Sequence, residues 1–166
     1  FCEVASAPDF DSGVVTVSQT SGIGGLMPNT VMFGWPGDDE ARLARLLKVV
    51  RRVDRQSRCA LVFRPAGRGF SRAGREMVLW WRGKEHNGDL MLLLAHLLAG
   101  TEGWRHVRIV LKTVVTDAEE ARKRQQEFEE MVEDIRIPAR VEALVRRADE
   151  TVEALIHRHS KHADLV

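Results

Sequence analysis

Two kinds of apolar pattern alternate along this chain. Short apolar runs bounded by glycine, proline or polar residues predict buried strands at about residues 29–34, 59–63, 77–81, 107–115 and 139–145. Between them, apolar side chains recur every three or four residues, which predicts amphipathic helices at about residues 10–21, 40–56, 89–99, 117–135 and 149–159. Residues 1–5 and 164–166 also have the pattern of strands.

The alternation of strand and helix predicts an α/β fold, with a mostly parallel sheet and helices on both of its faces. One helix start is well marked, because Thr116 or Asp117 can cap it and Glu119 or Glu120 can complete a capping box. The exception to the alternation is residues 64–74, a long basic loop that joins two strands without a helix. Residues 1–166 are expected to form a single α/β domain.

The composition is that of a soluble globular protein, with 44% apolar and 30% charged residues. The formal net charge is +1, so the overall charge favours neither nucleic acid nor a membrane as a partner. The charges are unevenly placed, because residues 41–82 are rich in arginine and residues 117–153 are rich in aspartate and glutamate. The basic segment is either a set of solvated helix faces or a surface for anionic lipid or a partner.

The cysteines and the apolar runs bear on location. Cys2 and Cys59 lie beside apolar residues, so we expect buried, reduced thiols, which fits a cytosolic location. The longest apolar run, Leu90–Ala99, predicts a helix buried on most sides, because it is far shorter than the roughly 20 residues of a membrane-spanning helix. No signal peptide is visible, and the strand-like ends indicate a piece of a larger protein.

A glycine-rich turn is the first candidate ligand site. Gly22, Gly24, Gly25 and Asn29 could approach a phosphate, as the glycines of dinucleotide-binding loops do. Such loops follow a strand and open a helix, whereas this turn follows a predicted helix and precedes a predicted strand. The pattern therefore favours a structural turn over a ligand loop.

The basic loop is the second candidate. Glycine and arginine alternate in it, which is typical of a mobile solvated loop and also suits contact with an anion or a lipid headgroup. The arginines concerned are Arg64, Arg68, Arg72 and Arg75.

The remaining candidates favour structural roles. A metal site on one helix face would need a ligand four residues after His157, where Lys161 stands, while His159 and His162 are three residues apart but near a predicted helix end. A solvated helix end is therefore expected, where the helix dipole favours cations. Trp80 and Trp81 are expected in a core or an interface rather than as a stacking platform. No serine lies in a nucleophile elbow and neither cysteine has an evident histidine partner, so no catalytic residue, metal ligand or cofactor is predicted.

The segment SGIGGLMPNTVMFGWP, residues 21–36, resembles the cytosolic C-terminal domain of the cation–chloride cotransporters. Members read close to Ser-Gly-Leu-Gly-Gly-Leu-Lys-x-Asn-Thr-Val and then Gly-Trp-Pro, so Met27-Pro28 replaces the usual Lys-x. Further similarities follow in the family's order: FCEV at residues 1–4, MVLWW at 77–81, HNGDLMLLL at 86–94, and weaker ones at 104–111, 135–141 and 160–166.

This resemblance implies a fold similar to the universal stress proteins, a Rossmann-like α/β sandwich. It also implies a regulatory and dimerisation domain on the cytoplasmic face of the cell membrane, below a transmembrane domain that performs ion transport. The long phosphorylatable insertions of animal members are absent, which indicates a prokaryotic relative. The partners implied are the protein's own transmembrane domain, a second copy and anionic lipid headgroups; neither nucleic acid nor an enzyme activity is expected.

Two alternatives come from other classes. The fold pattern and the glycine turn also suit a free-standing, stress-protein-like nucleotide-binding module. An α/β enzyme is the third reading, for which the sequence offers no site.

Overall fold

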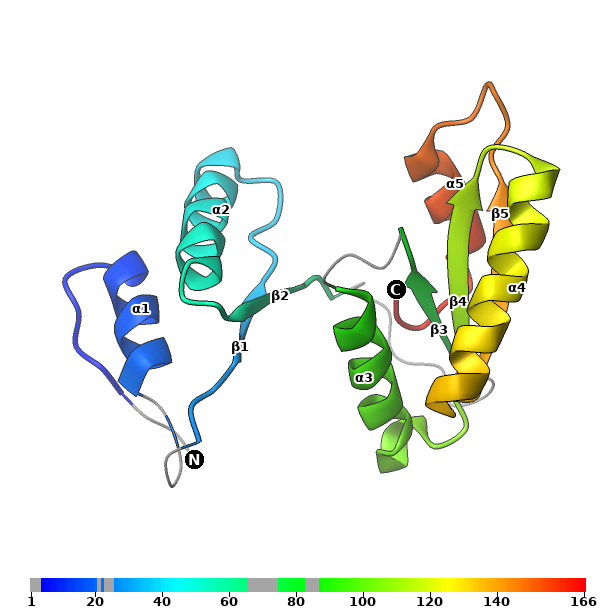
Figure 1. The fold of residues 1–166 in the computed structure, drawn as a ribbon. Helices are drawn as coiled ribbons and strands as arrows, with labels where there is room; N and C mark the ends of the chain where they lie inside the picture. Colours follow the sequence, from blue (N-terminus) through cyan, green and yellow to red (C-terminus); the bar gives the residue numbers. More distant parts are fainter. Residues whose placement is uncertain (1–3, 21, 23–25, 66–74, 83–86) are drawn as a thin grey trace. The chain divides into compact units, whose positions relative to one another are not determined.

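The computed structural model describes residues 4–20, 22, 26–65, 75–82 and 87–166 (Figure 1). The chain separates into two compact units, Phe1–Arg68 and Gly69–Val166. Within each unit, all strands of the described residues pair in parallel. The predicted α/β class and parallel pairing are therefore confirmed, while one domain over residues 1–166 stays a prediction.

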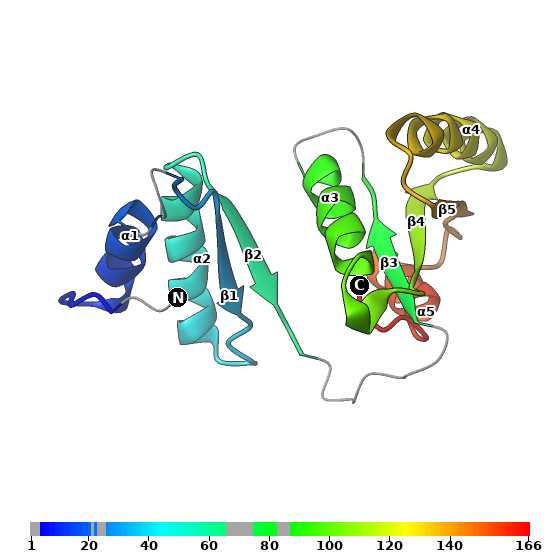
Figure 2. The ribbon, with the colours of Figure 1, turned by 90° about the horizontal axis from the view of Figure 1, so that it is seen from below.

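The described residues of the first unit form two helices and two strands. They are α1 (Phe10–Thr20), β1 (Thr30–Gly34), α2 (Glu40–Asp54) and β2 (Cys59–Phe63). β1 and β2 pair from Thr30 opposite Cys59 to Gly34 opposite Phe63. Figure 2 shows both helices on the same side of this strand pair, with α2 nearer to it.

The core of the first unit lies between α2 and the strands. Asp39 caps α2, because its carboxylate accepts a hydrogen bond from the Arg42 N–H at 3.0 Å. The helix then buries Leu46, Val49 and Val53 against Phe33 of β1. These residues recur at three and four positions, so a single apolar stripe fixes which side of α2 meets the strands.

The face of β1 and β2 that points away from the helices is exposed, so part of the sequence-based prediction is wrong. Residues 31–33 and 59–63 were expected to be buried, but Met32 is 68% exposed and Phe63 is also exposed. The Cys59 thiol is free and exposed rather than buried, and Cys2 lies outside the described residues. The cause is the alternation of side chains along a strand: within this unit, α1 and α2 cover only one face.

In the second unit, the part of the chain that the structure describes forms three strands, three α-helices and a short 3-10 helix. They are β3 (Glu76–Trp80), α3 (Gly88–Ala99), η1 (Glu102–Trp104), β4 (Arg108–Val115), α4 (Ala118–Ile135), β5 (Ala139–Val145) and α5 (Val152–His159). The strands lie in the order β3-β4-β5. The strand expected at residues 164–166 is reduced to one parallel bridge between Leu165 and Met77 of β3.

Helices cover both faces of the three-stranded sheet, as predicted (Figure 2). On one face, β-strand residues such as Leu79 and Leu111 pack against Leu92 of α3 and Phe128 of α4. On the other face lies α5, which buries Leu155. The universal-stress-protein-like sandwich, a finer description than this layering, stays a prediction.

Three local expectations have different outcomes. Asp117 caps α4 as predicted, accepting hydrogen bonds from the N–H groups of Glu119 and Glu120. The expectation that α3 is buried on most sides is wrong, because only one side of the helix meets the sheet and Leu97 is 58% exposed. The strand expected at residues 1–5 is absent at residues 4 and 5, where no described strand provides a hydrogen-bonded neighbour; residues 1–3 lie outside the described part.

Candidate functional site

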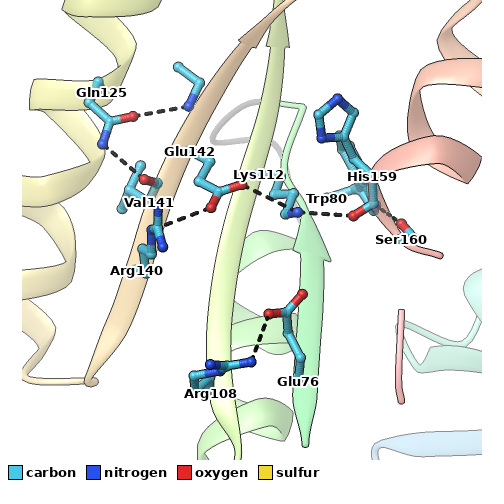
Figure 3. Close-up of polar contacts among 11 residues, drawn as sticks. Glu76, Trp80, Arg108, Lys112, Gln125, Arg140, Val141, Glu142, His159 and Ser160 are labelled. Carbon is cyan, nitrogen blue, oxygen red and sulfur yellow. Dashed lines mark hydrogen bonds and ion pairs between the residues drawn. The ribbon is translucent and has the colours of Figure 1, made fainter. Parts of the chain in front are cut away.

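The α5 face of the second unit carries a row of polar side chains. Trp80 lies opposite Lys112, and Lys112 lies opposite Glu142, in neighbouring parallel strands. Residues in register point to the same face of a sheet, so this row crosses β3, β4 and β5 beneath α5. Figure 3 shows the row together with the end of α5, and we call its six residues the Lys112 cluster: Trp80, Lys112, Arg140, Glu142, His159 and Ser160.

Lys112 is the central residue of the cluster. It is only 6% exposed, which is rare for a lysine and requires partners for its charge. Its Nζ donates a hydrogen bond to the His159 carbonyl oxygen at 2.9 Å and lies 3.3 Å from Glu142 Oε2. The carbonyl belongs to the last turn of α5, where the helix dipole favours a cation.

Two further contacts complete the cluster. Arg140 Nε lies 3.3 Å from the second carboxylate oxygen of Glu142, so that carboxylate is shared between two cations. Trp80 Nε1 donates a hydrogen bond to Ser160 Oγ at 2.9 Å, and Ser160 is the C-cap of α5. Side chains from two adjacent strands therefore hold the C-terminal end of α5 against the sheet.

The side chain of His159 has a perturbed protonation equilibrium. Burial lowers the pKa of His159 below its usual value of 6.5, and the positive charges of Arg158 and Lys112 lower the pKa further. The carboxylates of Glu142 and Glu150 act in the opposite direction. His159 is therefore neutral at neutral pH, and it places no second positive charge beside the Lys112 ammonium.

A second polar contact protects the last strand of the sheet. The side-chain amide of Gln125 in α4 donates to the Val141 carbonyl at 2.9 Å and accepts from the Ala143 N–H at 3.0 Å (Figure 3). These are the hydrogen bonds that a further strand would make along β5. The contact therefore covers backbone groups that an edge strand would otherwise expose.

The glycine turn has a structural arrangement in its described part. Gly22 follows α1, which ends at Thr20, so the turn stands at the C-terminal end of a helix, as predicted. A Cβ at Gly22 would come within 2.8 Å of the Leu26 carbonyl oxygen, which explains the need for glycine. Gly24 and Gly25 lie outside the described residues.

The backbone carbonyls of Pro28 and Asn29 form hydrogen bonds beside the start of β1. The Asn29 carbonyl accepts a hydrogen bond from the Cys59 N–H at 2.7 Å, which extends the β1–β2 ladder. The Arg58 guanidinium donates to the Pro28 carbonyl. These contacts show how the turn sets the start of β1, and the ligand loop stays the alternative prediction for it.

The structure describes two of the four arginines of the basic loop. The Arg64 guanidinium lies over the ring of Trp35 in the first unit, 5.8 Å from its centroid. Arg75 lies over Trp104 in the second unit at 5.0 Å and donates to the Gly103 carbonyl. Arg68 and Arg72 lie outside the described residues.

The sequence raised metal binding for the histidines and a core or interface position for the tryptophans. Among the residues that the structure describes, no group of three or more His, Cys, Asp and Glu could hold a metal ion. Trp81 is buried and meets Phe128 edge to face, with ring centroids 5.9 Å apart, so its predicted core role is confirmed. Trp80 has the anchoring role described above.

Sequence reasoning missed the Lys112 cluster, although a signal was present. Lys112 stands in the middle of a β-branched run, and Glu142 stands in the middle of the next predicted strand. Charged residues at the centres of two buried parallel strands indicate that the strands are neighbours and that the charges pair.

No known protein-family model matches this chain. Within the described residues, no helix combines the length and the apolar character needed to cross a membrane.

Proposed function

We propose that this chain is the cytosolic regulatory and dimerisation domain of a cation–chloride cotransporter-like secondary transporter. The single observation that carries the proposal is the series of motif similarities, which run in the family's order from residue 1 to residue 166. Transport itself would belong to a transmembrane domain outside this chain. The partners proposed are that domain, a second copy of the chain and anionic lipid headgroups, at the cytoplasmic face of the membrane.

The positions of the motif residues support this proposal. The Asn-Thr-Val-Met-Phe-Gly-Trp part of the first motif forms β1 and its exit, and Phe33 belongs to the core of the first unit. In the second motif, Trp80 donates a hydrogen bond to Ser160 at the end of α5, and Trp81 packs in the core of the second unit. The motif residues therefore have structural roles in both units, as expected for a domain that supports other parts of a protein.

The chemistry of the Lys112 cluster also favours scaffolding over catalysis. The Lys112 ammonium is engaged by the Glu142 carboxylate and by the carbonyl at the end of α5. A lysine that acts as a nucleophile must reach a substrate, whereas Lys112 is only 6% exposed and holds a helix to a sheet.

Ion uptake tests the proposal. Cells that produce the complete protein should take up rubidium, a potassium substitute, in a chloride-dependent manner, and the purified protein should sediment as a dimer. Cells that produce the complete protein with a transport-dead transmembrane domain provide the control. Uptake that is the same with and without chloride would contradict the proposal.

A nucleotide-binding module is the second candidate, and the parallel α/β architecture favours it. Ligands of such folds bind at the carboxyl ends of the strands, whereas the glycine turn precedes β1. Calorimetry with ATP and ADP tests the module directly, and an absence of heat at millimolar nucleotide would remove it.

A further inference from the structure

A cavity of about 410 Å³ lies in the first unit, at the carboxyl end of β1. Its apolar walls come from Phe10 at the start of α1, Phe33 of β1, Pro36 and Leu46 of α2. Arg42 and Arg45 of α2 line it as well, beside the backbone of Gly34. The volume is within the usual range of small-molecule sites, about 300–1,000 Å³.

The place of the cavity in the fold suits a ligand. In open α/β sheets, ligands bind where the carboxyl end of a strand passes to the following helix. Gly34 is the last residue of β1, and its backbone lines the cavity. Phe10 is 58% exposed and offers an aromatic surface.

The two arginines are not equivalent. Arg42 Nε lies 3.2 Å from the Asp39 carboxylate, which neutralises part of its charge. Arg45 is exposed, and no described residue forms an ion pair with its guanidinium. The cavity therefore combines apolar walls with one available cation.

We propose that this cavity binds a small organic carboxylate with an apolar body, held by Arg45 at its head and by Phe10, Phe33 and Leu46 along its body. A guanidinium binds a carboxylate through paired, charge-assisted hydrogen bonds. The lining residues other than the two arginines have apolar side chains, or none at Gly34, so they offer no side-chain donor or acceptor to a nucleobase. The single positive charge of Arg45 also suits a ligand with one negative charge better than it suits a triphosphate.

Isothermal titration calorimetry of the chain with 2-naphthoate and decanoate tests the site. Both should bind, whereas 2-naphthalenemethanol, which lacks the charge, and acetate, which lacks the body, should bind at least about tenfold more weakly, since a hydrogen bond to a charged group is worth one tenfold step or more. Equal affinity for 2-naphthoate and 2-naphthalenemethanol would overturn the proposal, as would an absence of heat with millimolar 2-naphthoate.

Three variants locate the binding. Arg45→Gln should weaken 2-naphthoate binding about tenfold, because it removes the charge-assisted pair. Phe10→Ala should also weaken 2-naphthoate binding, because it removes an exposed aromatic wall of the cavity, with the circular dichroism spectrum unchanged. Arg55→Gln, at the C-cap of the same helix and outside the cavity lining, is the matched control and should bind as the parent does. Parent-like binding by both Arg45→Gln and Phe10→Ala would place the ligand elsewhere and overturn the proposal.

Discussion

The ammonium of Lys112 lies 2.9 Å from the carbonyl oxygen of His159 and so joins the middle of β4 to the last turn of α5. Replacement of Lys112 by Met keeps much of the side-chain volume but removes the donor and the charge. The part-buried His159 carbonyl would then lose this donor, and of the two cations described beside Glu142, Arg140 would remain. We expect Lys112→Met to lower the free energy of unfolding by about 2–4 kcal/mol, measured by urea denaturation.

Arg108 offers a matched control in the same strand. It lies on the same face of β4 and pairs with Glu76 at 3.6 Å, but its side chain is exposed. Solvent screens such a pair, so Arg108→Met should change the free energy of unfolding by less than about 1 kcal/mol. Equal losses of unfolding free energy in Lys112→Met and Arg108→Met would contradict the claim that the buried contacts of Lys112 stabilise the fold more than an exposed ion pair does.

Protonation of His159 should destabilise the folded chain. Burial lowers its pKa in the folded state below 6.5, so the unfolded chain binds the proton more readily. The stability that the neutral imidazole contributes is complete above pH 6.5 and is lost as the pH falls from 6.5 through the folded-state pKa. Chemical denaturation at a series of pH values between 7.5 and 5.5 should show this loss.

Two variants separate His159 from the other titrating groups. His159→Gln should flatten the pH dependence of the free energy of unfolding in that interval, and His157→Gln, at an exposed position in the same helix, is the control for the loss of a histidine from α5. The capping carboxylates act at lower pH, because hydrogen bonds from backbone N–H groups lower the pKa of Asp117 below 3.8 and that of Glu120 below 4.5. An unchanged slope in His159→Gln would refute the assignment.

Gly88 should not tolerate alanine, although alanine favours helices. A Cβ at Gly88 would overlap the indole ring of Trp81, which is buried against Phe128. Overpacking of this kind costs about 1–3 kcal/mol, more than the roughly 1 kcal/mol gained in helix propensity. Urea denaturation followed by tryptophan fluorescence should show a less stable protein. Gly100→Ala, at the exposed C-cap of α3, is the control and should be neutral or slightly stabilising.

The arginines of the basic loop should attract anionic membranes. Substitution of Arg64, Arg68, Arg72 and Arg75 by Ser should weaken binding to phosphatidylserine liposomes, by about 1 kcal/mol for each arginine near the surface at low salt. The control carries four Arg-to-Ser changes elsewhere in the chain, at Arg105, Arg122, Arg124 and Arg147. Equal partition of both variants and the parent would rule out the loop as the contact.

The fold was largely predictable because its elements are marked locally. The β2 and β5 strands have the bounds expected from sequence, since apolar runs there end at polar residues or follow Pro138. The exposure of Met32 was not predictable in the same way. It depends on which faces of the sheet the helices cover, and the apolar pattern of a strand does not specify this.

The Lys112 cluster was harder to predict because its partners are distant in sequence. Lys112 meets the carbonyl of His159, 47 positions later, through the pairing order β3-β4-β5 and the placement of α5. A charged residue in the middle of a buried strand indicates that it has a partner, but the sequence does not identify the partner residue. The cavity beside Arg45 likewise depends on the relative positions of α1, α2 and β1, whereas the sequence directed attention to the glycine turn.

The proposed membership of an ion carrier is the central claim, and the complete reading frame that encodes these residues tests it most directly. Sequencing it should reveal about ten to twelve apolar segments upstream of residue 1, each of the roughly 20 residues that a membrane-spanning helix needs. A reading frame that encodes no such segments would contradict the account.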